Sequence, residues 1–368
     1  MAETGGQRYI VAGDVGGTNT RLLLYTVPAD TPEATQGHAT PGDLVHRSKY
    51  ANEDYTSFEE VVEDFLASVP PGAAPGLEER SRVAVAAFAV AGPVDEGAAV
   101  LSNRGSWAFV EADLEAALGF GRVVLANDFV AAGYGLLTLC PDDLVTLQDV
   151  EARVGAPIAC IGAGTGLGEC FLTADPRTTS NGHPHYTAFP SEGGHAEWAP
   201  RTELEVELLA FLKTKFAEKN RVSVERVVSG KGLFNIYEFL RGKFPNAVDD
   251  ALDAKVFASD DQRGAVIAQG ADQGDELCTK AIDIMLSAYG SEAGVAALKW
   301  LPYGGLYIAG GLAPKNIHRI TPDSGFMAAF FDKGRLSPQL KKVPLHVVIN
   351  EDIGQRGAHR LAYSFLSQ

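Results

Sequence analysis

The sequence predicts an α/β protein built from two domains. The chain has 368 residues, which is long for one domain and suits two. A strand, a glycine turn and a second strand follow one another within residues 9–27 and again within residues 158–172, which indicates two related α/β halves. Hydrophobic residues make up 46% of the chain and charged residues 21%, a composition typical of soluble globular proteins.

The individual elements follow from apolar runs and from the spacing of apolar residues. A continuous apolar run at 83–90 predicts a buried strand, and apolar residues at helical spacing predict a helix over 58–69. The same criteria predict strands at 9–13, 21–27, 122–126, 158–161, 170–172 and 305–309, and helices at 111–118, 203–213, 277–300 and 356–366. The Pro- and Gly-rich segments 28–43 and 70–76 are expected to be loops.

The predicted small domain comprises residues 1–136 together with a C-terminal helical segment, 351–368, and the predicted large domain comprises residues 137–350. No low-complexity segment or long linker separates the two halves, so a short hinge is expected between them.

Charge and targeting signals limit the classes of partner. The net charge is −16 and the sequence pI is about 4.9, so the surface repels nucleic acid and anionic lipid, and neither is expected to bind. A phosphate ligand would then have to be held locally, by backbone N–H groups, helix N-termini or a metal ion. The chain shows no signal-peptide pattern, no apolar run long enough to span a membrane and no CxxC pair among its four cysteines, so a cytoplasmic location is expected.

Two glycine-rich segments are candidate phosphate sites. Residues 13–18 read Gly-Asp-Val-Gly-Gly-Thr, and residues 162–168 carry four glycines at alternate positions. Glycine lets backbone N–H groups approach phosphate oxygens without a clash, and Asp14 can hold a magnesium ion, usually through water. For the first segment a plain hairpin turn is the alternative. The second segment is neither a dinucleotide fingerprint nor a Walker A loop, because the required third glycine and the Gly-Lys-Ser/Thr sequence are missing.

Polar residues at predicted strand ends and in one loop are further candidates. Gly310 and Gly311 follow a strand and leave room for a flat group such as adenine, although, taken alone, the pair is better explained by a turn that needs positive φ. Asp128 follows the strand at 122–126, where a carboxylate can accept a proton from an attacking hydroxyl or can instead cap a helix. Glu192 and His195 flank two glycines and suit adjacent sugar hydroxyls, with a weak metal site or a solvated loop as alternatives.

In combination these segments resemble the bacterial-type glucokinases of the hexokinase/actin/Hsp70 superfamily. The matching segments keep the family's order and cover nearly the whole chain: residues 13–19, 102–103, 107–109, 127–129, 162–168, 192–195, 223–230, 308–311 and 331–335. The resemblance implies a two-domain sugar-kinase fold of the actin-like ATPase and ribonuclease H-like kind, with an interdomain cleft.

The resemblance also implies the roles of residues. Asp128 would be the catalytic base, and the other glucose ligands would be Asn103, Asn127, Glu192, His195 and Glu225. The phosphate-binding residues would be Gly13, Asp14, Val15, Gly16, Gly17, Thr18, Gly164 and Thr165, and the adenosine motif would be Gly310 and Gly311. The implied reaction transfers the γ-phosphate of ATP to the 6-hydroxyl of D-glucose with Mg²⁺, as the first step of glycolysis, in a homodimer.

Several rival functions stay open. The acceptor could be another hexose, the donor could be polyphosphate, and the chain could be a non-enzymatic ATP- or sugar-binding module. A polyphosphate enzyme would need a cationic channel, which an acidic chain does not indicate, and a pure sensor has no need of a base such as Asp128. The residues after His195 lack the cysteine-rich zinc motif of the related repressor/kinase (ROK) branch, which favours the non-ROK glucokinases.

Overall fold

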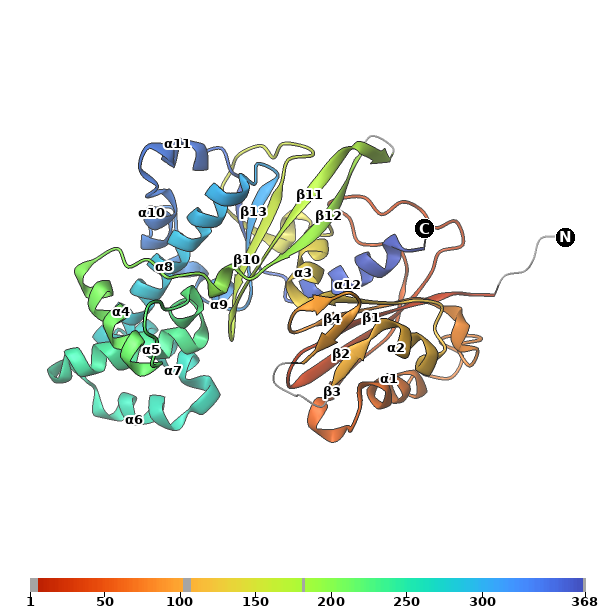
Figure 1. Ribbon diagram of the computed structural model, residues 1–368, viewed down its shortest axis with the longest axis horizontal. Helices are drawn as coiled ribbons and strands as arrows, with labels where there is room; N and C mark the ends of the chain where they lie inside the picture. The colour runs from red at the N-terminus through yellow and green to blue at the C-terminus, as the bar shows by residue number, and fades with distance from the viewer. Residues whose placement is uncertain (1–5, 102–106, 181–182, 367–368) are drawn as a thin grey trace. The chain divides into compact units, whose positions relative to one another are not determined.

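The structure is a computed structural model, and it describes residues 6–101, 107–180 and 183–366. The chain forms two compact units (Figure 1): unit 1 comprises Met1–Asp143, Thr179–Pro190 and Asn350–Gln368, and unit 2 comprises Leu144–Thr178 and Ser191–Ile349. These units differ from the predicted domains mainly because Thr179–Pro190 clusters with unit 1. The predicted domain boundaries themselves remain a prediction.

Unit 1 is built on a five-stranded sheet of order β3-β2-β1-β4-β8. β1 is antiparallel to β2 and parallel to β4, and β4 is parallel to β8. A small three-stranded sheet, β5-β6-β7, lies in the same unit. The elements are β1 (Tyr9–Val15), β2 (Asn19–Thr26), β3 (Leu44–Ala51), α1 (Phe58–Ala67), β4 (Val83–Val90), β5 (Val94–Asp95), β6 (Ala98–Val100), β7 (Ala108–Val110), α2 (Glu111–Leu118), β8 (Val123–Asn127), α3 (Asp128–Leu136) and α12 (Ile353–Ser364).

The two faces of this sheet bury different apolar side chains. One set, which includes Phe65 and Phe88, packs with α1 and α2. The other set, which includes Ile10, Val85 and Leu361, packs with α12, and this C-terminal helix lies against β1, β4 and α3 (Figure 1). Burying a Phe, Leu or Ile side chain stabilises a fold by about 1.5–3 kcal/mol, so α12 contributes substantially to unit 1.

Unit 2 is organised around a six-stranded sheet of order β12-β11-β10-β13-β14-β9. β10 is antiparallel to β11 and parallel to β13, and β13 is parallel to β14. The elements of this sheet and the helices that accompany it are β9 (Leu144–Gln148), β10 (Ile158–Ala163), β11 (Leu167–Ser180), β12 (His183–Ser191), α4 (Glu203–Lys215), α5 (Gly230–Lys243), α6 (Asp250–Ala258), α7 (Arg263–Asp272), α8 (Glu276–Trp300), β13 (Gly305–Ala309), α9 (Leu312–Lys315), α10 (Gly325–Phe331), α11 (Ser337–Leu340) and β14 (Leu345–Val348).

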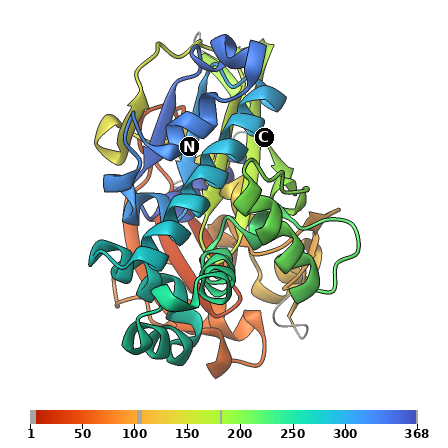
Figure 2. The ribbon, with the colours of Figure 1, turned by 90° about the vertical axis from the view of Figure 1, so that its left-hand side faces the viewer.

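The long helix α8 is the centre of the unit 2 core. It packs against α5, α7 and α10 and against strand β10, and Figure 2 shows it running the length of this helical layer. Its buried side chains include Ile282, Met285 and Tyr289. The N-terminus of α8 is capped by Asp275, whose side chain accepts from the Cys278 N–H, which satisfies one of the free backbone donors at a helix start.

The two main sheets share one topology. In each, a central strand (β1 or β10) pairs antiparallel with the next strand across a glycine turn and parallel with a later strand on its other side. The predicted α/β fold class and the predicted internal repeat are therefore confirmed. The strands at 83–90 and 305–309 and the helix at 111–118 have the predicted bounds, whereas β3, β12 and α5 to α7 were not predicted. Within the described residues, no helix is long and apolar enough to cross a lipid bilayer.

Candidate active site

The first glycine turn, residues 16–18, joins β1 to β2 in unit 1. The Gly16 N–H donates to the Asn19 carbonyl at 3.0 Å, which closes the turn, and Thr18 is exposed. Gly13 and Val15, in contrast, are buried within β1, and a Cβ on Gly13 would overlap the Phe88 ring. Of the phosphate-binding residues predicted here, only Asp14 and the turn residues reach the surface. Gly13 is glycine because a larger side chain would not fit beside Phe88.

A buried asparagine that the sequence analysis did not single out holds this turn. Asn52 begins the short helix η1 (Asn52–Asp54) and has no exposed surface. Its Nδ2 donates to the Gly16 carbonyl and its Oδ1 accepts from Thr20 Oγ1, both at 2.8 Å. Its backbone N–H donates to the Thr18 carbonyl at 2.9 Å. Asn52 therefore fixes the backbone of the first glycine turn with two hydrogen bonds and joins it to the Thr20 side chain with a third.

Asp14 is the candidate magnesium residue of unit 1. Its Oδ2 lies 3.0 Å from Arg21 Nη1, and its side chain is 28% exposed. Within the described part of the chain, no group of three or more His, Cys, Asp or Glu side chains is arranged to hold a metal ion. Magnesium that accompanies a nucleotide needs only one or two protein carboxylates, because phosphates and waters supply the other oxygens. Asp14 beside an exposed turn fits that arrangement.

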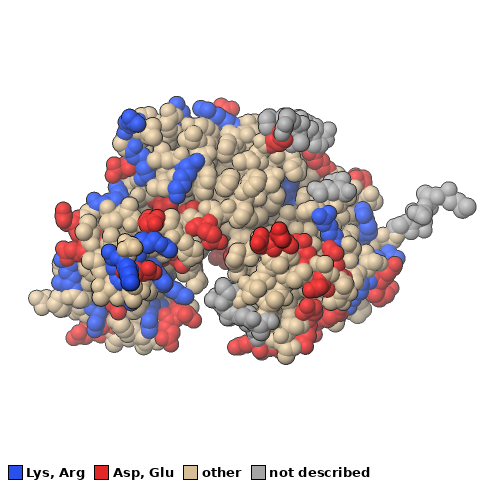
Figure 3. Space-filling model, in the orientation of Figure 1, with Lys and Arg blue, Asp and Glu red and all other residues tan. Residues whose placement is uncertain are grey.

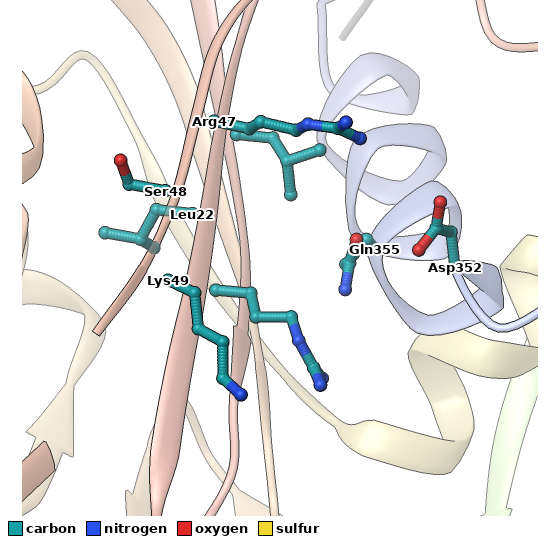
Figure 4. Close-up of a pocket in the computed structure, with 8 residues that line it drawn as sticks. Leu22, Arg47, Ser48, Lys49, Asp352 and Gln355 are labelled. Atoms are coloured by element: carbon teal, nitrogen blue, oxygen red, sulfur yellow. The ribbon is translucent and has the colours of Figure 1, made fainter. Parts of the chain in front are cut away.

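Arg21 also lines a basic pocket, a cavity of about 330 Å³ in unit 1 (Figure 4). The other polar lining residues are Arg47, Ser48 and Lys49 on β3 and Asp352 and Gln355 at the start of α12. Figure 4 shows Arg47 reaching toward the side of the pocket where Gln355 and Asp352 lie. Among the described residues, no predicted glucose ligand lines this pocket.

At the end of β8, Asn127 and Asp128 occupy distinct positions. Asn127 is the N-cap of α3: its Oδ1 accepts from the Phe129 N–H at 2.9 Å and from the Val130 N–H at 3.3 Å, while its Nδ2 donates to the Gly92 carbonyl at 3.0 Å. Asp128 is the first residue of the helix, is half-buried, and its Oδ1 accepts from the Phe129 N–H at 2.9 Å. The alternative that Asp128 is the N-cap is therefore wrong. Asn103 lies outside the described residues.

The second glycine turn, residues 164–166, joins β10 to β11 in unit 2. The Gly164 N–H donates to the Gly166 carbonyl at 2.8 Å, and Thr165 is exposed. No described atom lies within 4 Å of the position a Cβ on Gly164 would take. The outer glycines, Gly162 and Gly168, are paired opposite each other within the strands. The predicted four-glycine loop is thus a three-residue turn on a two-stranded stem, with open space beside Gly164.

Neighbouring elements support this turn. The hydroxyl of Tyr289 on α8 accepts from the Ala163 N–H at 3.1 Å and lies 3.3 Å from the Ala309 carbonyl. Gly310 follows β13 with φ +76°, and a Cβ there would overlap the backbone of Ala163. Gly310 is therefore required by its backbone conformation, as the alternative interpretation held, and it also brings the predicted adenosine motif against the end of β10. A Cβ on Gly311, the next residue, would make only an ordinary contact with the end of the Lys315 side chain, at 3.8 Å.

Helix α5 begins beside the second glycine turn. The Gly230 N–H donates to the Gly164 carbonyl at 2.8 Å, and Ser229 caps the helix by accepting from the Gly232 N–H. The start of a helix carries partial positive charge, which favours a phosphate nearby. Residues 229–232 read Ser-Gly-Lys-Gly, which lacks the Gly-Lys-Ser/Thr of a Walker A loop, and they lie at the edge of the second glycine turn.

Residue Leu167, at the start of β11, connects the turn with two predicted sugar ligands. Its N–H donates to Glu225 Oε2 at 2.9 Å, and Glu225 lies in the short helix η5 (Val224–Arg226). Its carbonyl touches Gly194, where a Cβ would overlap it. Residues 192–195, which we call the glucose loop after their predicted role, and Glu225 are therefore packed directly against the second glycine turn. Unit 2 brings all of its predicted site residues into one neighbourhood.

The glucose loop presents two exposed polar side chains. Glu192 Oε2 and His195 Nε2 are 3.9 Å apart, and their side chains are 67% and 58% exposed. The loop backbone is held from behind, since the His195 carbonyl accepts from Arg221 Nη1 at 2.9 Å. The Gly193 N–H donates to Ser191 Oγ at 3.1 Å. A fixed backbone with two exposed polar groups can bind neighbouring hydroxyls without reorganising.

Comparison with known proteins identifies the family. A model of the family described as glucokinase matches residues 11–364. The glucokinase of Nostoc sp. is 40% identical over 362 residues, which is 95% of this chain and 97% of that protein. The chain belongs to the glucokinase family. Its activity is therefore ATP-dependent phosphorylation of a sugar, glucose, as the sequence analysis predicted.

Solved structures agree with this assignment. A crystal structure of glucokinase from an Antarctic psychrotroph matches with a TM-score of 0.75 and 27% identity, covering 97% of this chain and 99% of that chain. The glucokinase of Balamuthia mandrillaris, solved in complex with glucose, matches with a TM-score of 0.70 and 19% identity, covering 98% and 95% of the two chains. The match to the Balamuthia mandrillaris protein shows a shared fold.

Proposed function

We propose that Asp128 is the general base of the glucokinase reaction. The 6-hydroxyl of glucose attacks the γ-phosphorus of ATP, the bond from that phosphorus to the β–γ bridging oxygen breaks, and Asp128 takes the hydroxyl proton. The observation that carries this proposal is that Asn127, and not Asp128, caps α3. Asp128 is thereby held at the carboxyl end of β8 on the first turn of a helix, half-buried, where a carboxylate can orient a hydroxyl.

Glucose is proposed to bind through the exposed side chains of Glu192 and His195 and through Glu225, with Asn103 and Asn127 as further ligands. The support is strongest in unit 2, where Glu225 and the glucose loop share the contact with Leu167. Asn127 already uses its Oδ1 and one Nδ2 hydrogen within the protein, which leaves one amide hydrogen for a ligand. Balamuthia mandrillaris glucokinase has been solved with glucose, which supports the same sugar here.

ATP is proposed to bind through the two glycine turns, with the adenosine at Gly310 and Gly311. Gly16 and Gly164 use their own N–H groups within the turns, so the remaining N–H groups of residues 16–18 and 164–166 and the positive dipole at the nearby start of α5 would bind the phosphates. Asp14 would hold Mg²⁺, which neutralises charge on the transferred phosphoryl group when bound. Closure around both substrates would exclude water as a competing acceptor.

We further propose that the protein works in the cytoplasm as a homodimer and supplies the first step of glycolysis. The net charge of −16 disfavours nucleic acid or an anionic membrane as partner, and Figure 3 shows acidic and basic side chains mixed over the face it displays. A broader hexokinase specificity is the second candidate. A coupled assay with glucose, mannose and fructose separates the two, since a glucokinase should show much higher kcat/KM for glucose.

The test of the base is Asp128→Asn, which keeps the size of the side chain and removes its basic oxygen. Loss of a general base typically costs about two to four orders of magnitude in rate, so kcat should fall by at least 100-fold. Glucose binding measured by calorimetry should fall far less, and the melting temperature should stay near that of the wild type. Asp113→Asn is the matched control, because Asp113 is an exposed carboxylate in the first turn of α2 in the same unit. Near-normal kcat in Asp128→Asn would remove this residue from the mechanism.

A further inference from the structure

A buried carboxylate lies directly behind the glucose loop. Glu169 follows the second glycine turn on β11 and is 1% exposed. Within the described residues its Oε1 has no hydrogen-bond partner. Burying a carboxylate with unfilled hydrogen-bonding capacity is costly, so its presence next to the buried residues Cys170 and Leu172 calls for a functional reason.

Glu169 is connected to the glucose loop in two ways. The Ser191 hydroxyl donates a hydrogen bond to the Glu169 carboxylate, and Ser191 Oγ in turn accepts from the Gly193 N–H at 3.1 Å. Gly193 also rests directly on the carboxylate, because a Cβ at Gly193 would overlap Glu169 Oε2. The carboxylate, one hydroxyl and one backbone N–H thus form a chain that ends between the two exposed side chains of the loop.

We propose that Glu169 is a positioning residue for glucose binding, which sets the conformation of the glucose loop through Ser191 and Gly193. The inference rests on the proposed role of Glu192 and His195 as glucose ligands. Neither Glu169 nor Ser191 needs to touch the sugar. They act on the backbone from which Glu192 and His195 extend. A substitution of Glu169 or Ser191 should therefore alter glucose affinity and leave ATP affinity unchanged.

The charged surroundings make this chain sensitive to pH. Burial, followed by the nearby negative charge of Glu292, raises the pKa of Glu169 to about 7, while Lys299 and the Ser191 hydroxyl oppose that rise. Glu292, Lys299 and Tyr289 all face Glu169 from α8, and Ser191 and Gly193 face it from the loop side. The group therefore changes charge near neutral pH.

Ser191 makes different hydrogen bonds with the ionised and the protonated forms of Glu169. An ionised carboxylate only accepts, so it holds the Ser191 hydroxyl as donor and leaves the Ser191 oxygen free to accept from the Gly193 N–H. A protonated carboxyl can itself donate to Ser191 Oγ and compete with Gly193. The loop is accordingly best held above the pKa of Glu169, and glucose affinity should rise as the pH increases through neutrality.

The experiment measures KM for glucose and for ATP with the full-length protein at several values from roughly pH 6 to pH 8.5, a range that spans the pKa of Glu169. In the wild type the glucose KM should fall about two- to tenfold across this range, the effect of about one net hydrogen bond. Both proteins share the pH dependence that comes from the titration of the other site groups. Once this shared part is subtracted, the glucose KM of Glu169→Gln should not change with pH. Glu292→Gln removes the neighbouring negative charge and should move the midpoint to lower pH. The ATP KM should not respond to either substitution.

Ser191→Ala tests the connection itself. It should raise the glucose KM at high pH. The double variant with Glu169→Gln should have a glucose KM no higher than that of either single variant, because both substitutions break the same series of hydrogen bonds. Identical glucose KM profiles for wild type and Glu169→Gln, with both proteins folded by their melting curves, would overturn the proposal. Glu192→Ala separates this failure from a failure of the loop assignment: if Glu192→Ala leaves the glucose KM unchanged, the loop does not bind the sugar, and the basis of the inference is lost as well.

Discussion

Replacing Asn52 by Ala tests how strongly tertiary contacts hold the first glycine turn. The substitution removes two side-chain hydrogen bonds of 2.8 Å, to the Gly16 carbonyl and from Thr20 Oγ1, in a position with no exposed surface. Each buried polar group left without a partner costs about 1–3 kcal/mol, so unit 1 should lose roughly 2–5 kcal/mol of stability. For a unit of this size each kcal/mol lowers the melting temperature by about 2–4 °C, which predicts a fall of roughly 4–20 °C.

The kinetic readout separates turn positioning from general destabilisation. Assayed well below its melting temperature, Asn52→Ala should raise the ATP KM about three- to tenfold, because the turn spends part of its time outside the binding conformation. The glucose KM should change little. Thr20→Val is the matched control, since it removes one of the same hydrogen bonds with little change in shape, and its effect should be smaller and not additive with that of Asn52→Ala. A destabilised Asn52→Ala protein with a normal ATP KM would refute the assigned link between this side chain and the nucleotide.

Three further predictions concern the substrate, the metal and pH. Glu192→Ala should lower kcat/KM for glucose by about one to two orders of magnitude, with little change in the ATP KM, as steady-state assays on both substrates can establish. Removing magnesium with EDTA should abolish phosphorylation, and full activity in metal-free buffer would exclude the proposed role of Asp14. Because burial raises the pKa of Glu169 from 4.5 to about 7, the folded state binds this proton more tightly than the unfolded chain. Its stabilising effect is fully present only below about pH 4.5 and is lost as the pH rises through about 7. Melting curves should therefore show Glu169→Gln to be more stable than wild type at pH 8.5, by up to about 3 kcal/mol, with a difference under about 1 kcal/mol near pH 5.

The sequence by itself determined the elements whose signals are local. The continuous apolar run of β4 and the strand β13 were predicted with the observed bounds, because a buried parallel strand reads as an uninterrupted apolar segment. The two glycine turns were also predicted, since clustered glycines between apolar runs are a local signal for a turn. The order of motifs along the chain was enough to predict the family that the comparisons established.

Elements with a weak or mixed pattern were not predicted. β3 is an edge strand in which exposed and half-buried residues do not alternate regularly, so its sequence, which includes Arg47 and Lys49, does not distinguish it from a loop. The helices α6 and α7 bury only a few side chains each, so their apolar spacing is too sparse to predict a helix. Such segments become regular because the packed core next to them favours one conformation.

Tertiary structure alone decided which residues support the site. Nothing in the sequence near Asn52 indicates that its side chain reaches back 36 positions to Gly16, because that contact depends on the register of three strands. Glu169 did carry a signal, as a lone carboxylate before the apolar residues Cys170 to Leu172, but only the packing of α8 and the glucose loop shows that it is buried. Local sequence fixes backbone preference and periodicity, whereas burial and pKa depend on neighbours that are distant in the chain and are supplied only by folding.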